Sequence, residues 1–291
     1  MSRNLRLAML AGFAAAHAGT AHSAGPEFGY VYTAETEEPG ETELSLWATD
    51  RRGRGEGRYA AQDYRLEIER GISDRFQLSG YVNFAGHHVK GLGGEFEPLH
   101  RSLAFQGLEA EFKYQLSNAE THGLGLALYA EPGWSGISKV TGERSTEYEI
   151  ELKAIVQKNL LAGRLVWAAN LTLEPEWERE RGELGAGAIE PRTEKELGVE
   201  LSSGAAYRAG RNWWVGIEAR YHSVYPDWTH GLHRENYAFY AGPTLNWIAG
   251  EWSVTATYLP QLVGGPGKDG SSREFDDHER RELRLKISYE F

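Results

Sequence analysis

Apolar and polar residues alternate along most of the chain, and the last segment shows the pattern most clearly. Leu283, Leu285 and Ile287 fall on one face of an extended strand, whereas Arg284 and Lys286 fall on the other. A period of two predicts β-strands with one apolar and one polar face. About 12 such strands are predicted, and they cover residues 42–49, 63–69, 76–84, 108–114, 124–129, 149–157, 165–174, 196–207, 213–222, 237–247, 252–258 and 282–291.

The connections between these segments alternate in length. Short connections follow the even-numbered strands, at residues 71–75, 117–123, 158–163, 208–212 and 249–251. Long ones follow the odd-numbered strands, at residues 50–58, 85–102, 133–145, 178–191, 223–236 and 262–278. Tight periplasmic turns and longer extracellular loops are typical of bacterial outer-membrane barrels. The apolar face is also rich in aromatic residues near the predicted strand ends.

These patterns predict an all-β fold, a transmembrane antiparallel up-and-down β-barrel of about 12 strands over residues 42–291. The barrel must close because no water satisfies backbone groups in lipid. A secreted soluble β-protein is the alternative, in which the apolar face would cover a core. Pro243 lies within a predicted strand and has no N–H to donate, so we expect a bulge there or a different strand boundary.

The first residues differ from the rest and predict export. Arg3 and Arg6 precede a short apolar run over residues 7–16, and small residues follow. This is the pattern of a signal peptide, predicted over residues 1–23, and the apolar run is too short to span a bilayer. Residues 24–41 form a lead segment that we expect either to join the first strand or to enter the periplasmic mouth.

Composition narrows the function classes. The chain has no cysteine, which excludes disulfides, thiolate zinc sites and cysteine nucleophiles. The net charge of −11 argues against a nucleic-acid partner. A mean hydropathy of −0.53 excludes a helical membrane protein but suits a barrel whose strands alternate. No motif predicts a cofactor. His222 and Ser223 are adjacent and therefore fall on opposite strand faces, so we predict no hydrolase.

Two stretches resemble known barrels. The terminal strand, with Tyr289 and Phe291, resembles the signal that the barrel-insertion machinery recognises in outer-membrane proteins. The opening resembles a family of uncharacterised outer-membrane barrels loosely grouped with transporters of phenol meta-cleavage pathways. The matching stretches are FGYVYTAET at 28–36, Pro39-Gly40 with Trp47, GRY at 57–59 and YRLEIERGISDRFQLSGYVNF at 64–84. The resemblance implies an outer-membrane barrel and assigns no binding or catalytic residues.

The polar faces predict a strongly acidic lumen. The candidate lumen-lining residues are Asp63, Arg65, Glu67, Glu69, Glu109, Glu111, Lys113, Glu149, Glu151, Lys153, Glu200, Glu218, Arg220, Arg284 and Lys286. One interpretation is a passive channel for a small cationic or neutral solute, because carboxylate rings select cations. The other is a closed barrel whose lumen is filled by hydrated ion pairs, and which acts through its extracellular loops in adhesion or metal capture.

Histidines and arginines gather in the predicted extracellular loops. His87, His88, His222, His230 and His233 are candidate ligands of a metal at the rim, although their spacing matches no strong metal motif and solvated loop histidines are the alternative. The segment RRGRGEGR at 51–58 is expected to contact lipopolysaccharide phosphates or to remain a flexible loop.

Overall fold

The fold is described from a computed structural model that covers residues 28–92, 98–180, 193–267 and 271–291. The predicted signal peptide at 1–23 and the first residues of the lead lie outside the described residues. The strands are β1 (Thr42–Arg52), β2 (Arg58–Ser73), β3 (Phe76–Lys90), β4 (Leu99–Ser117), β5 (Gly125–Ser135), β6 (Ser145–Leu160), β7 (Leu165–Glu180), β8 (Thr193–Arg208), β9 (Trp213–Pro226), β10 (Asn236–Ala249), β11 (Trp252–Gly265) and β12 (Arg281–Glu290).

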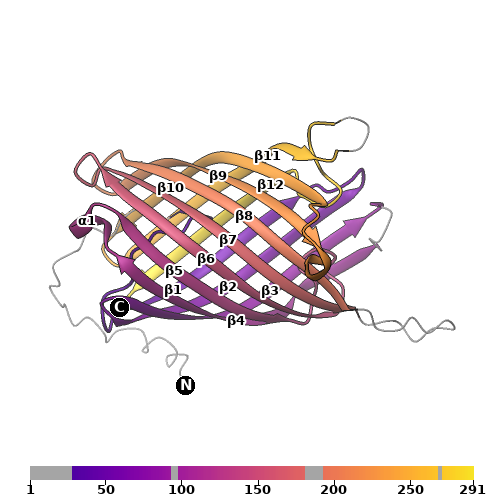
Figure 1. The fold of residues 1–291 in the computed structure, drawn as a ribbon, viewed down its shortest axis with the longest axis horizontal. Coiled ribbons are helices and arrows are strands. Elements are labelled where there is room, and N and C mark those ends of the chain that lie inside the picture. The colour runs from indigo at the N-terminus through magenta and orange to yellow at the C-terminus, as the bar shows by residue number, and fades with distance from the viewer. Residues whose placement is uncertain (1–27, 93–97, 181–192, 268–270) are drawn as a thin grey trace, which may run out of the picture.

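The strands form one closed barrel, which confirms the predicted fold class. Each strand pairs antiparallel with its neighbours in sequence, and β1 pairs with β12 from Glu43↔Glu290 to Arg52↔Arg281. Figure 1 shows the tilted strands and places the C-terminus at the same end as α1 (Ala119–His122), which lies between β4 and β5. This end carries the short turns, so we call it the periplasmic end and the opposite one the extracellular end.

The two faces of the strands have the predicted polarity. On β12, Leu283 and Leu285 are 49% and 38% exposed, whereas Glu282 and Ser288 are 6% and 1% exposed. The other strands repeat this arrangement, with leucine, isoleucine and aromatic side chains outside and polar side chains inside. A soluble protein buries its apolar face, so this inverted arrangement is that of a barrel surrounded by hydrocarbon.

Pro243 lies inside β10, where it pairs with Ile217 of β9. The register between β10 and β11 shifts between Phe239 and Tyr240. The expected bulge therefore lies a few residues before the proline rather than at it, and the strand continues through Pro243. Pro260 of β11 lies in the facing stretch, so each of the two paired strands lacks one backbone N–H donor here.

Helices are minor elements of the fold. Asn118 caps α1 by accepting from the backbone N–H groups of Glu120 and Thr121, and a 3-10 turn, η1 (Trp228–His230), lies between β9 and β10. Among the residues described, no helix is long and apolar enough to cross a membrane.

A charge on the outer face tests the membrane assignment. Leu285→Arg, in the middle of β12, is expected to lower the free energy of unfolding by about 2–4 kcal/mol, because the guanidinium would lie near the bilayer centre. Leu124→Arg, at the periplasmic rim, should cost only about 0–1 kcal/mol. Denaturant unfolding of the refolded protein in lipid vesicles measures both values. Equal, small costs at the two positions would contradict a lipid-facing surface.

Candidate functional site

The lead segment, residues 28–41, lies inside the periplasmic half of the barrel. At the rim, the Gly40 N–H donates to the Gly71 carbonyl near the end of β2 at 2.9 Å. From there the chain passes inward, and Phe28, Val31 and Ala34 are buried against inward-facing wall residues. The lead therefore occupies part of the lumen at this end of the barrel.

Glu218 of β9 binds the deepest part of the lead. Its two carboxylate oxygens accept backbone N–H groups from Gly29 at 2.8 Å, Tyr30 at 2.7 Å and Val31 at 3.1 Å. The Thr257 hydroxyl donates to the same carboxylate at 2.8 Å. Glu218 is fully buried, so its charge depends on these donors for stabilisation.

Amide side chains of the wall bind the next residues of the lead. Asn170 accepts the Tyr32 N–H at 2.7 Å and donates to the Tyr32 carbonyl at 2.8 Å. Gln157 accepts the Ala34 N–H at 2.8 Å, and Gln115 donates to the Ala34 carbonyl at 2.9 Å. The wall thus satisfies backbone groups of the lead through side chains, as a binding site satisfies a peptide ligand.

Aromatic rings of the lead contact cations of the wall. The guanidinium groups of Arg220 and Arg284 lie 4.5 and 4.0 Å from the centre of the Tyr30 ring. The Lys153 ammonium lies 4.5 Å from the Tyr32 ring. Burial raises the pKa of both phenols, so each remains protonated at neutral pH. These contacts combine apolar burial with cation–π attraction.

Two glycines allow the lead to approach this closely. A Cβ atom on Gly204 of β8 would lie 2.8 Å from Cε1 of Phe28, and a Cβ atom on Gly29 would lie 2.6 Å from the Thr257 hydroxyl. Either side chain would clash with its neighbour, so the close packing of the lead requires the absence of both.

All fifteen predicted lumen residues lie on the inward face, where charges are paired. Arg65 contacts Glu109 and lies 3.0 Å from Glu131. Arg220 lies 2.7 Å from both Glu200 and Glu282. The remaining predicted bases also have acceptors or acidic neighbours. Lys153 contacts Glu151, and Lys286 lies 3.1 Å from Glu43. Arg284 donates to Thr49 and to the Gly29 carbonyl, and Lys113 lies near Glu111. Much of the acidic lumen is therefore an ion-pair network.

Extracellular residues also enter the lumen, which the sequence did not indicate. Arg51 donates to Asp63 at 2.7 Å, to Glu279 at 2.8 Å and to the Lys139 carbonyl at 2.5 Å. Arg54 donates to Glu279 at 2.9 Å. Burial opposes ionisation of Glu279, but Arg54 and Arg51 lower the pKa of this carboxyl well below its usual range. Arg51 thereby links the β5–β6 connection to the β11–β12 connection across the extracellular mouth.

This arrangement corrects the expectation for Arg51 and Arg54 within residues 51–58, whereas Arg52 and Arg58 remain exposed. The Arg51 and Arg54 side chains are 13% and 6% exposed and turn inward, because the buried Glu279 carboxylate offers them charge-assisted hydrogen bonds. Arg52 remains 48% exposed and pairs with Asp50. The inward pair is consequently turned away from lipopolysaccharide.

The structure separates the five candidate metal-binding histidines. His87 and His88 lie within β3 rather than in a loop, and adjacent positions of a strand face opposite ways. His87 approaches the Lys139 carbonyl, whereas His88 contacts His100 outside the lumen. His222 lies 3.6 Å from Glu200, and His230 and His233 are exposed. Among the described residues, the three groups close enough to hold a metal ion contain glutamates alone.

The fold and lumen define the class as an outer-membrane-type β-barrel. The chain belongs to the family of unknown function DUF6662, whose sequence profile matches residues 20–291. Among curated proteins, none matches the sequence.

Solved structures are similar in fold. The COG4313 outer membrane channel from Pseudomonas putida F1 matches with a TM-score of 0.61 and 14% identity over 89% of this chain and 98% of that one. The β domain of the Bordetella autotransporter BrkA matches with a TM-score of 0.54 and 12% identity over 87% and 100%. The translocator domain of the autotransporter NalP from Neisseria meningitidis gives 0.51 and 10% over 88% and 90%. At these identities, the similarity shows the fold alone.

Glu218→Ala tests how the lead is held. Loss of a charged acceptor is expected to speed hydrogen exchange at the Gly29, Tyr30 and Val31 amides by at least about tenfold, since hydrogen bonds to charged groups contribute about 1.5–3 kcal/mol. The Ala34 amide, bound by Gln157, should change less. Glu251→Ala, at an exposed periplasmic turn, serves as the control. Unchanged exchange at all three amides would contradict the assigned contacts.

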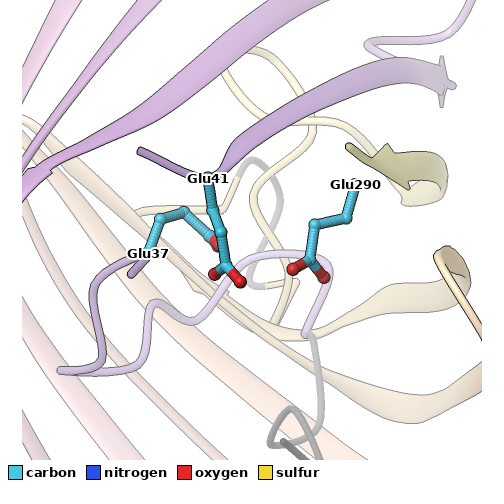
Figure 2. A group of neighbouring side chains, drawn as sticks. All are labelled: Glu37, Glu41 and Glu290. Atoms are coloured by element: carbon cyan, nitrogen blue, oxygen red, sulfur yellow. The ribbon is translucent and has the colours of Figure 1, made fainter. Parts of the chain in front are cut away.

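Three carboxylates meet where the lead passes the periplasmic rim. Figure 2 shows Glu37 and Glu41 of the lead converging with Glu290 of β12, and one oxygen of each lies within 4.8 Å of the others. Burial, reinforced by the Glu43 and Glu290 carboxylates, raises the pKa of Glu37 to about 7. Glu69 and Lys113 also act on this group, and both lower its pKa.

Docking of the lead should therefore depend on pH. A released Glu37 would titrate near its ordinary value of 4.5, whereas the docked group titrates near 7. Below pH 4.5 the titration of Glu37 adds no free-energy cost to docking of the lead. This cost develops as the pH rises toward 7, because the released carboxyl ionises and the docked one does not. A spin label on Thr36→Cys should report a ratio of mobile to docked lead that grows on the order of a hundredfold between pH 5 and 8. Glu37→Gln should abolish the trend and Glu120→Gln should keep it; a pH-independent spectrum in the parent contradicts the assignment.

Proposed function

We propose that the protein is an outer-membrane channel for passive passage of a small cationic or neutral solute, closed by its lead segment and opened when that segment leaves the lumen. The observation that carries this proposal is the way the lead is bound. Side chains such as Glu218 and Asn170 hold its backbone, and these contacts can break without opening the sheet. The similarity to a structure described as an outer membrane channel supports the proposal.

The charge of the wall supports a preference for cations. The inward faces of β6, β7 and β8 carry Glu147, Glu149, Glu174, Glu176 and Glu196 toward the extracellular end. At the periplasmic rim, Glu37, Glu41 and Glu290 add a second acidic group. Carboxylates at both ends attract cations and repel anions from a narrow passage.

A second candidate is a non-conducting surface barrel that acts through its extracellular loops. The inward contacts of Lys139, Arg51 and Glu279 favour it, since they cross the lumen at the extracellular end as the lead does at the other. We propose no enzymatic activity. His222 lies beside Glu200, while the Ser223 hydroxyl donates to the Val199 carbonyl, so the two residues do not form a nucleophile–base pair.

The position of the terminal aromatic residues supports the proposal that the barrel-insertion machinery recognises β12. Tyr289 and Phe291 are exposed at the periplasmic end, with ring centres 6.2 Å apart. Their rings also lie at the depth where aromatic residues meet lipid headgroups.

Conductance in planar bilayers tests the channel. The refolded full chain is expected to open rarely, whereas a variant lacking residues 28–38 should show frequent steps with a reversal potential that indicates cation preference. Glu218→Ala should lie between them, and Glu251→Ala should match the parent. If the deletion variant folds but remains silent, the non-conducting barrel is favoured. Anion preference would contradict the proposed selectivity.

A further inference from the structure

Three groups of glutamates converge within the described part of the chain, and one of them differs from the others. In the group of Glu67, Glu69 and Glu111, neighbouring side chains donate to each carboxylate: Trp47 to Glu67 at 2.7 Å, Ser79 to Glu69 at 3.3 Å, and Gln77 to Glu111 at 3.1 Å. The group of Glu37, Glu41 and Glu290 is half-buried at the periplasmic rim. The third group comprises Glu147, Glu149 and Glu176.

This third group lies on the inward wall near the extracellular end. Glu147 and Glu149 are alternate residues of β6, and Glu176 of β7 pairs directly with Glu149 in the sheet. Because alternate residues of a strand share a face, all three side chains point to the same side. One carboxylate oxygen from each lies within 4.8 Å of the others, which is close enough for one ion to bridge them.

One oxygen of the group lacks a partner. Glu147 is 2% exposed, and its Oε1 is buried with no hydrogen-bond donor in the described protein. Burying a carboxylate oxygen without a donor or a cation is costly, and native proteins rarely leave such an atom unsatisfied. The orphaned oxygen therefore points to a ligand.

The local charge also favours a cation. Lys139 contacts the group, with its ammonium 2.6 and 2.5 Å from the two oxygens of Glu149 and 3.9 Å from Glu109. The charged groups acting on Glu147 include this lysine together with Glu149, Glu174 and Glu178. One ammonium does not neutralise that many carboxylates in a partly dehydrated wall.

We propose that Glu147, Glu149 and Glu176 bind a calcium ion inside the extracellular end of the barrel. The donor set is purely carboxylate oxygen, which hard cations prefer, and it offers neither imidazole nor thiolate to zinc or copper. The three carboxylates carry six oxygens, of which the two of Glu149 are shared with Lys139, and water can complete the six to eight ligands that Ca²⁺ accepts in flexible geometry, whereas Mg²⁺ demands a near-octahedral arrangement. This site goes beyond the channel proposal and stands whether or not a solute passes.

Calcium titration of the refolded full chain in non-ionic detergent tests the site. Calorimetry with CaCl₂ is expected to show saturable binding with a dissociation constant on the order of 10⁻⁴–10⁻³ M, as in extracellular calcium modules, and weaker binding of MgCl₂. The double variant E147Q/E176Q should bind Ca²⁺ at least about tenfold more weakly. The control pair E120Q/E251Q removes the same charge at exposed periplasmic positions and should bind as the parent does.

Two further measurements keep the result decisive. Heat-modifiable migration on gels shows whether each variant is folded, and the single variant E147Q replaces the double variant if the latter fails. Calcium should also raise the thermal unfolding midpoint of the parent but not of E147Q. The proposal is overturned if the parent shows no saturable uptake below about 10 mM Ca²⁺. Equal binding by E147Q/E176Q, or loss of binding in E41Q/E290Q instead, overturns it as well.

Discussion

The structure depends on the requirement that every backbone N–H and C=O group within hydrocarbon find a partner in the protein. The pairing of β1 with β12 meets this requirement, because it leaves no strand with an open edge in the barrel. Closure then determines the polarity of both faces. Apolar residues such as Leu283 must face outward, and the alternation of the strands sends their neighbours, such as Arg284, inward.

The lumen meets a second requirement, since charges in a narrow space must be paired or hydrated. Arg65 and Arg220 each serve two carboxylates, and the backbone of the lead supplies further donors to Glu218. The lead is therefore part of the electrostatic balance of the wall. Without the lead, water could reach Glu218 and replace the lost donors, so that carboxylate can be satisfied with the lead in place or without it.

The sequence predicted the features that depend on the alternation of apolar and polar residues. The strands, their order and the inward position of residues such as Glu111 and Lys153 all follow from a period of two. The same rule could have shown that His87 and His88 face opposite sides, had β3 been extended beyond residue 84. The alternating aromatic residues Phe28, Tyr30 and Tyr32 were also a signal that the lead contacts the wall. The inward turn of Arg51 and Arg54 had no such signal, because it depends on Glu279, which is distant in sequence.

Gly29 and Gly204 together leave the space that the lead needs at its present depth in the barrel. One lies on the lead and the other on the wall, and a single methyl group at either would clash with its neighbour. They therefore permit the observed insertion depth, and with it the length of lumen that the lead fills. An alanine at either position would force the lead or its neighbour to shift, so the depth of insertion depends on atoms that are missing from two residues.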